Sequence, residues 1–332
     1  MHELRKDPLL GRWVAVLEEG ESKTPGEYEV PPETGNAADC MLCPGNEGKT
    51  PGEITSIREG GRWRSRVIPN FRPVLQIEGE LGRRGVGMYD KMNGIGANEI
   101  IVETSEHHVR PEDIGAEQVL RIIRLYHERV ADLERDARLR YILIYKNSGK
   151  YAGATYTHPH SEIVATPIIP KRIKEELDGA KQYYDYKERC VFCDILREEL
   201  RLGERVISET RDFFAFCPFA PRFPFEFWIV PKRHNCAFQD SSPAELEDLG
   251  LMLWTMLRKM RRALGDPPYN YVFHTAPNRI PRHNHWHTLG EDFHWHVEVM
   301  PRLLRTSGFE WGSGFYVLTT SPEDAAKYLR EA

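Results

Sequence analysis

Two halves of this chain repeat the same order of cysteines, strands, helix and histidines, and this repeat constrains the fold more than any other feature. Each half contains a C-x2-C pair, a histidine after a predicted strand, a long amphipathic segment, another strand and a His-x-His motif. The distances between matching elements drift, as they do when a duplicated domain acquires loop insertions. We therefore predict two tandem domains, over residues 1–180 and 181–332.

Local patterns predict a mixture of helices and strands in both halves. Apolar residues recur at helical spacing over residues 115–136, and Ser242 with Glu245 forms a capping box at the start of another helix. The segment 171–187 is also predicted to be helical, and the glycine-rich segment 79–98 is expected to be a functional loop. Strands are predicted over residues 9–18, 67–71, 99–103, 140–145, 205–209, 213–217, 226–231, 269–274 and 293–300.

The composition excludes several classes of protein. A formal net charge of −5 argues against a large nucleic-acid-binding surface. The sequence has no run of about 18 apolar residues, the length that a membrane helix requires. The N-terminal segment lacks the apolar core of a signal peptide, so we expect a cytoplasmic protein. In such a chain, C-x2-C pairs are typical of metal ligands or redox dithiols rather than structural disulfides.

A stretch near the middle of the chain carries the densest set of reactive side chains. His158, His160 and Glu162 would share one face of a strand, because side chains alternate with period 2. A single His-x-His is usually a polar strand face in contact with solvent. Here a Gly/Ala/Thr turn over residues 149–155 precedes it, and small residues let backbone N–H groups approach an anion. This arrangement favours phosphoryl or nucleotidyl chemistry. We expect that chemistry in the first half, because no such turn precedes His294.

The cysteines and histidines together predict metal sites. Two thiolates and two imidazoles make a closed tetrahedral zinc site, the alternative being spare buried thiols. The repeat does not decide between His107 and its neighbour His108. The two predicted ligand sets are Cys40, Cys43, His107 and His158, and separately Cys190, Cys193, His234 and His294.

If His158 holds a metal, His160 on the same face is free for chemistry. A neutral imidazole beside an anion-binding turn can attack phosphorus and split one displacement into two. Catalysis would then depend on positioning and on hydrogen-bond donors to the phosphoryl oxygens.

Longer motifs resemble a known family over nearly the whole chain. The first half has C-x2-C, Tyr-x-Asn-x-Gly at 145–149, the small-residue turn and His-Pro-His at 158–160. The second half has CVFCDILREEL, FAPRFPFEFWIVPKRH and FEWGSGFYV. These motifs resemble galactose-1-phosphate uridylyltransferase, which belongs to the histidine-triad superfamily.

The resemblance implies a fold, a reaction and partners. The fold would be α+β, with two tandem histidine-triad-like domains whose antiparallel half-barrel sheets carry helices outside. The enzyme would be a nucleotidyltransferase of carbohydrate and galactose metabolism that resembles UDP-glucose–hexose-1-phosphate uridylyltransferase. It would act by double displacement through a nucleotidylated His160 on a nucleotide sugar and a sugar phosphate or phosphate. A homodimer that binds neither nucleic acid nor membrane is also implied.

The resemblance also implies positions for the nucleotide and for two metals. It implies zinc at the first ligand set, and the presence of Cys190 and Cys193 favours the second set given above. Other members of the family hold the second metal with a glutamate and three histidines, which map onto Glu176, His274, His294 and His296. The nucleotide-binding positions map onto Asn70, Phe71, Asn147, Gly153, Ala154 and Thr155.

This sequence departs from the family in three places. Glu162 replaces a glutamine, Glu310 replaces a lysine, and residues 21–25 lack the family's arginines. These changes leave two alternatives: a phosphorylase that transfers adenylyl groups from ADP-glucose or adenylyl sulfate to phosphate, and a nucleotide-binding zinc protein with weak or lost catalysis. An ionised Glu162 about 4 Å from a phosphoryl oxygen would be repelled by about 4 kcal/mol. We therefore expect this catalytic-site carboxyl to be protonated, turned onto a basic partner, or bound to another substrate group.

Overall fold

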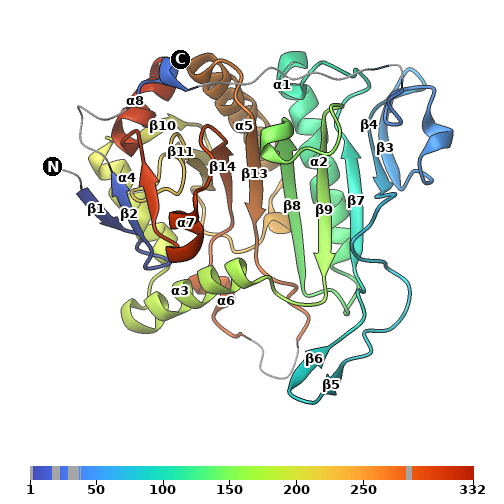
Figure 1. Cartoon of the computed structure of the whole chain (residues 1–332), viewed down its shortest axis with the longest axis horizontal. Coiled ribbons are helices and arrows are strands. Elements are labelled where there is room, and N and C mark those ends of the chain that lie inside the picture. Colours follow the sequence, from blue (N-terminus) through green and yellow to red (C-terminus); the bar gives the residue numbers. More distant parts are fainter. Residues whose placement is uncertain (1–2, 17–22, 29–36, 38, 282–285) are drawn as a thin grey trace.

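One antiparallel sheet crosses the molecule from side to side (Figure 1). The computed structural model describes residues 3–16, 23–28, 37, 39–281 and 286–332. Within them, ten strands form this sheet, and every neighbouring pair is antiparallel. Their spatial order is β10 (Val206–Glu209), β11 (Phe213–Phe216), β12 (Phe227–Pro231), β14 (His296–Pro301), β13 (Tyr269–His274), β8 (Tyr141–Ser148), β9 (His160–Thr166), β7 (Ala97–Val102), β4 (Arg62–Pro69) and β3 (Thr55–Glu59).

The order of the strands reproduces the repeat that the sequence predicts. Each half contributes five neighbouring strands, and β8 and β13 meet in the middle of the sheet. Their pairing extends from Tyr269 opposite Ser148 to Phe273 opposite Ile144. The predicted α+β class with antiparallel strands is confirmed. The division into two domains at residue 180 stays a prediction, since the sheet is continuous across it.

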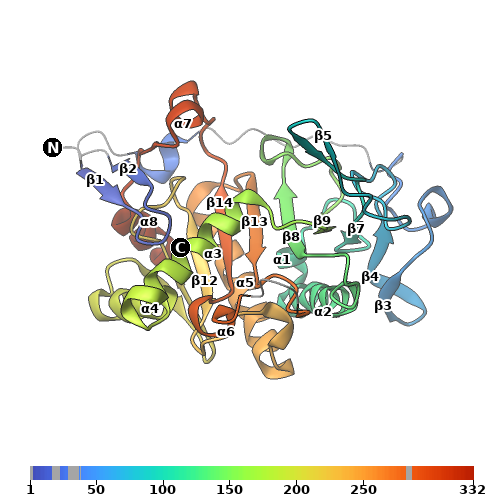
Figure 2. The same ribbon diagram turned by 90° about the horizontal axis from the view of Figure 1, so that it is seen from below.

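Two long helices cover one face of the sheet. Figure 2 shows α2 (Ala116–Leu133) and α5 (Pro243–Leu264) on one side and α7 (Gly308–Ser313) with β5 (Arg84–Val86) on the other. The predicted capping box begins α5: the Glu245 N–H donates to the Ser242 hydroxyl at 3.2 Å, and the Ser242 N–H donates to the Glu245 carboxylate at 2.8 Å. The helices approach closely at Gly250, where an added Cβ would lie 3.1 Å from the Cα of Leu120. Their buried faces make one apolar core with the sheet.

On the other face of the sheet, the covering elements of the described residues lie over the second-half strands (Figure 1). The covering elements are α3 (Lys171–Lys187), α4 (Val191–Leu202), α6 (Leu289–Asp292), α7 and a small sheet of β1 (Glu3–Lys6), β2 (Trp13–Val16) and β15 (Tyr316–Leu318). The same face of β7, β8 and β9 is left open, beside the β5 hairpin with β6 (Tyr89–Lys91).

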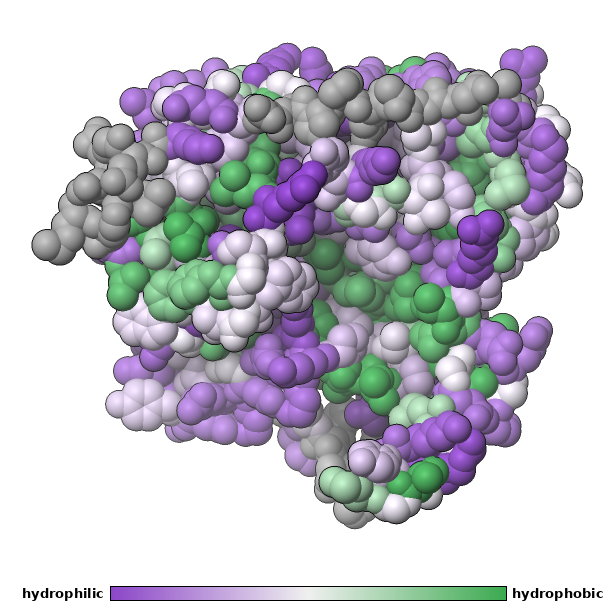
Figure 3. Space-filling view, viewed as in Figure 1, coloured by the Kyte–Doolittle hydropathy of each residue, from purple (hydrophilic) through white to green (hydrophobic). Residues whose placement is uncertain are grey.

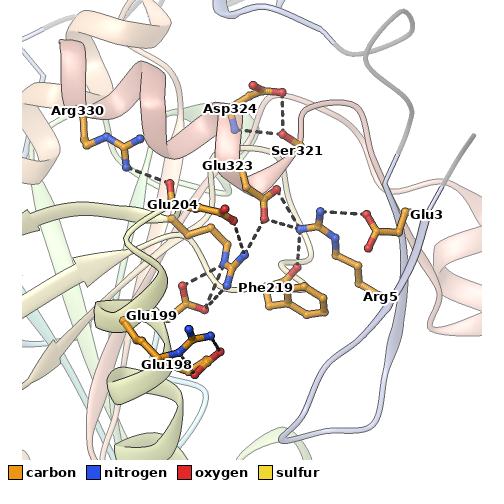
Figure 4. Close-up of polar contacts among 12 residues, drawn as sticks. Glu3, Arg5, Glu198, Glu199, Glu204, Phe219, Ser321, Glu323, Asp324 and Arg330 are labelled. Atoms are coloured by element: carbon orange, nitrogen blue, oxygen red, sulfur yellow. Dashed lines mark hydrogen bonds and ion pairs between the residues drawn. The ribbon is translucent and has the colours of Figure 1, made fainter.

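Ion pairs attach the small sheet to the C-terminal helix α8 (Pro322–Glu331), as Figure 4 shows. The carboxylate of Glu323 lies 2.9 Å from the guanidinium of Arg5 and 2.8 Å from that of Arg205. Both guanidinium groups also lie over the ring of Phe219, at 4.8 and 5.2 Å from its centroid. This network connects β1 to the second half.

Four predicted elements differ from the structure. The strands β9 and β14 begin at His160 and His296, so His158 and His294 lie just before the strands. The predicted loop 79–98 contains the β5–β6 hairpin. The predicted strand 9–18 is reduced to β2, because the Asp7 carboxylate accepts from two backbone N–H groups and makes a turn; its last two positions lie outside the described residues. No helix in the described part of the chain has the length and apolarity that a bilayer crossing requires.

Candidate functional site

The open face of the first half is hollowed. Figure 3 shows a concavity in front of the strands labelled β8 and β9 in Figure 1, with apolar side chains on its floor. His160, the first residue of β9, lies at this face and is only 4% exposed. Its Nδ1 lies 2.8 Å from the carbonyl oxygen of His158, so Nδ1–H donates there and Nε2 keeps its lone pair. Burial lowers the pKa of His160, so the imidazole is neutral at pH 7.

Beside His160, the structure brings together the first predicted ligand set. The ligand atoms of Cys40, Cys43, His107 and His158 lie within 4.8 Å of one another. The Cys43 sulfur is 3.2 Å from Nδ1 of His107 and 3.5 Å from Nδ1 of His158. Sulfur and nitrogen ligands of a tetrahedral zinc are about 3.6 Å apart, so these residues fit that ion. His107 lies against the cysteines, whereas His108 is exposed.

A backbone carbonyl orients His158 toward the sulfurs. Nε2–H of His158 donates to the carbonyl of Thr104 at 2.7 Å, which leaves Nδ1 as the ligand atom. Burial lowers the pKa of His158 to about 4, so this nitrogen carries no proton at neutral pH.

The second half contains the equivalent cluster. The ligand atoms of Cys190, Cys193, His234 and His294 also lie within 4.8 Å of one another. The Cys193 sulfur is 3.3 Å from Nδ1 of His234 and 3.6 Å from Nδ1 of His294. Nε2–H of His234 donates to the carbonyl of Gly290 at 2.9 Å. His294 therefore faces the cysteines, as the repeat predicts.

The alternative second-metal residues form a buried ion-pair network instead. Nδ1 of His274 lies 2.7 Å from the carboxylate of Glu176, and Nε2 lies 3.4 Å from that of Glu298. Burial alone lowers the pKa of His274, but the two carboxylates outweigh it and raise that pKa to about 10. The ligand atoms of Glu176, His274 and His296 also lie within 4.8 Å of one another, so these three residues could hold a metal ion as well.

A residue from the second half shapes the small-residue turn. Gly149 and Gly153 have φ values of 88° and 89°, a conformation that favours glycine. The Nδ2 group of Asn270 donates to Oδ1 of Asn147 at 2.7 Å and to the carbonyl of Ala152 at 2.8 Å. Sequence reasoning missed Asn270, because no local pattern indicates that β13 pairs with β8.

Glu162 shares the face of His160, as strand alternation predicts, but it contacts neutral donors. Its Oε2 accepts from Nδ2 of Asn70 at 3.2 Å and from Nδ2 of Asn98 at 3.5 Å. The hydroxyl of Tyr145 hydrogen-bonds the same carboxyl, and burial together with the charge of Glu162 raises the pKa of Tyr145. The partners of Glu162 are thus amides and a phenol rather than a basic side chain.

The opposite face of the same strands holds a buried polar network. Lys146 and Glu103 form an ion pair, with side chains only 5% and 1% exposed. The hydroxyl of Tyr126 lies 2.6 Å from both the hydroxyl of Ser161 and the hydroxyl of Tyr271. Each tyrosine oxygen is 3.4 Å from the Glu103 carboxylate. This network lies directly behind His160.

Glu310, one of the departures from the family, caps a helix. Its carboxylate accepts the backbone N–H of Ser307 at 2.7 Å and the Ser307 hydroxyl, at the start of α7. Of the segment 21–25, residues 21 and 22 lie outside the described residues.

Known proteins resemble this chain along its whole length. The family model for the N-terminal domain of galactose-1-phosphate uridyl transferase matches residues 1–170. An ADP-glucose phosphorylase from Arabidopsis thaliana is 32% identical over 99% of this chain and 92% of its own length. A galactose-1-phosphate uridylyltransferase from Thermotoga maritima is 29% identical, over 100% and 98%. The crystal structure of the Arabidopsis phosphorylase with bound ADP-glucose has a TM-score of 0.84 at 31% identity and covers 100% of this chain and 99% of that one.

Proposed function

This chain belongs to the galactose-1-phosphate uridylyltransferase family of nucleotidyltransferases, and from that premise we propose that it transfers a nucleotidyl group from a nucleoside diphosphate sugar through His160. The observation that carries the proposal is the state of this imidazole. Its Nδ1 proton is held by the His158 carbonyl, and its neutral Nε2 lies at the floor of the open face.

The proposed reaction has two displacements at the same phosphorus. Nε2 of His160 attacks the α-phosphorus, a P–N bond forms, and the bond to the bridging oxygen breaks, which releases the sugar 1-phosphate. An oxygen of the acceptor phosphate then attacks phosphorus and breaks the P–N bond. Throughout, the His158 carbonyl accepts the hydrogen bond from Nδ1–H of His160 and stabilises the positive charge on the nucleotidylated imidazole.

We favour ADP-glucose as the donor and phosphate as the acceptor, so that the products are ADP and glucose 1-phosphate. The similarity to a phosphorylase with bound ADP-glucose over the full length supports this choice. Glu310, engaged as a helix cap, offers no positive group for a sugar phosphate. The second candidate is transfer of uridylyl groups from UDP-glucose to a hexose 1-phosphate, which the similarity to the Thermotoga enzyme supports.

The two Cys2His2 clusters are proposed to bind one zinc ion each. When bound, zinc would supply a closed tetrahedral link rather than a reacting group. At the first cluster it would fix His158, whose carbonyl orients His160. At the second it would join the start of α4, through Cys190 and Cys193, to the segment before β14.

A homodimer in the cytoplasm is also proposed, on the family resemblance. Light scattering on the purified protein and fractionation of the producing cells test these two points.

The central experiment is intact-protein mass spectrometry after incubation with ADP-glucose or UDP-glucose. We expect a covalent gain of one adenylyl group, which disappears when phosphate is added. The His160→Gln variant should show no adduct while its melting temperature and zinc content equal those of the parent protein. An adduct on His160→Gln, or none on the parent protein with either donor, would contradict the proposal, and a uridylyl adduct would favour the second candidate.

A further inference from the structure

One carboxylate connects the strand of His160 to the segment that follows β4. Glu162 lies two residues after His160 in β9, and Asn70 follows the last residue of β4. Oε2 of Glu162 accepts from Nδ2 of Asn70 at 3.2 Å. This hydrogen bond therefore joins β9 to the segment after β4, two parts of the open site that are far apart in the sequence.

Both ends of the Asn70 amide make hydrogen bonds in this arrangement. Its Oδ1 accepts the backbone N–H of Arg72 at 2.9 Å, and its own backbone N–H donates to the carbonyl of Asn98 at 2.8 Å. Because a carboxylate only accepts hydrogen bonds, Glu162 requires the NH2 end of the Asn70 amide to face it. The oxygen end must then face Arg72, so the carboxylate selects the orientation of the amide and with it the turn of the backbone.

Asn98 provides a second, weaker connection of the same kind. Its Nδ2 lies 3.5 Å from Oε2 of Glu162, and its Oδ1 lies 3.4 Å from the backbone nitrogen of Val74. The side-chain amides of Asn70 and Asn98 thus each contact the Glu162 carboxylate at one end and a backbone N–H of the segment 70–74 at the other.

This segment carries Phe71 to the side of the nucleophile. The ring of Phe71 is 5.4 Å from that of Tyr156, and Tyr156 is 5.3 Å from the imidazole of His160. A displacement of the segment would therefore move an aromatic wall of the site without moving His160, which its own hydrogen bond to His158 holds in place.

We infer that Glu162 is a positioning residue: its hydrogen bond to Asn70, which we call the clasp, fixes the Asn70 side chain and so places Phe71 against the nucleobase of the nucleotide sugar. The ligand in this statement rests on the proposed function. The clasp gives Glu162 a role in binding the donor, in place of the direct contact with the phosphoryl group that its sequence position suggests. It also accounts for a carboxylate at this position, because the charge is satisfied by amide and phenol donors before any substrate arrives.

A donor–acceptor exchange tests the clasp. Asn70→Asp places two carboxylates face to face with no proton between them, so the affinity for nucleotide should fall by about tenfold or more. In the double variant Glu162→Gln/Asn70→Asp, the new amide can donate to one aspartate oxygen while the other still accepts from Arg72. Affinity should then recover to within about threefold of the parent protein. Gln182→Glu, which converts an exposed amide on α3 to a carboxylate and adds the same charge, is the matched control and should change nothing.

The measurement is titration calorimetry with ADP-glucose and UDP-glucose in a His160→Gln background, so that affinity is read without turnover. Steady-state rates with an intact His160 should show the effect of Asn70→Asp in KM, with kcat largely retained. Melting temperature and zinc content are measured for each variant. If Asn70→Asp has lost its zinc, Asn98→Asp is tested in its place, alone and together with Glu162→Gln.

Two results would overturn the clasp. One is a double variant that binds no better than Asn70→Asp, and the other is a loss confined to kcat. The proposed function fails on a different result, the absence of a nucleotidyl adduct on the parent protein, whatever the affinities of these variants.

Discussion

Removing the positive charge of Lys146 should destabilise this protein strongly, because the charge is buried in an ion pair with Glu103. The side chains of Lys146 and Glu103 are 5% and 1% exposed, so water cannot replace either partner. In Lys146→Met the Glu103 carboxylate keeps only two tyrosine hydroxyls at 3.4 Å, which is a long distance for a hydrogen bond. Breaking a buried pair from one side costs about 3–5 kcal/mol, and we expect a loss in that range.

Removing both charges should cost far less. In Glu103→Met/Lys146→Met, Tyr126 still hydrogen-bonds Ser161 and Tyr271 at 2.6 Å, so its hydroxyl stays satisfied. Replacing a buried pair by apolar residues is often neutral or stabilising, and we expect stability within about 1 kcal/mol of the parent protein.

Urea unfolding followed by circular dichroism, at a constant excess of zinc, measures both effects. We expect the parent protein and the double variant to have similar urea midpoints, and Lys146→Met to have a much lower one. A Lys146→Met protein as stable as the parent would show that the lysine charge is not buried as described. A double variant as unstable as Lys146→Met would show that the loss does not come from leaving the Glu103 charge without its partner.

Three further outcomes are expected. The purified protein should contain about two zinc ions per chain by metal analysis. The Cys40→Ser variant should lose one zinc ion and its transferase activity. The Cys190→Ser variant should also lose one zinc ion, but its main effect should be a lower melting temperature. Because the pKa of His274 is raised to about 10 from an ordinary 6.5, its contribution to stability is complete below pH 6.5 and lost as the pH rises to 10; melting curves from pH 6 to 10 should show this decline, and a His274→Gln protein should lack it. In Gly179→Ala a Cβ would lie 2.2 Å from the carbonyl oxygen of Leu9, so the N-terminal segment must move and the melting temperature should fall, whereas Gly290→Ala, with open space around it, should be unaffected.

The elements that depend on local patterns could be predicted from the sequence. The helices α2 and α5 match the segments predicted from apolar spacing and from the Ser242 capping box, since both signals act within a few residues, and α3 matches the predicted helical segment 171–187. The repeat also predicted that each C-x2-C pair meets two histidines, although it left His107 and His108 undecided, because each half builds a similar cluster on the same order of strands.

Other features depended on which strands lie side by side, and no local pattern records that choice. The pairing of β8 with β13 brings Asn270 to the turn of the first half, and the pairing of β7 with β9 brings Asn98 to Glu162. The orientation of His107 rather than His108 was decided by contact with Cys43, 64 residues away. The sequence by itself thus determined the α+β class and the cysteine and histidine side chains that form the two clusters. Only the tertiary structure decided what each of these side chains faces, because that depends on strand register between distant segments.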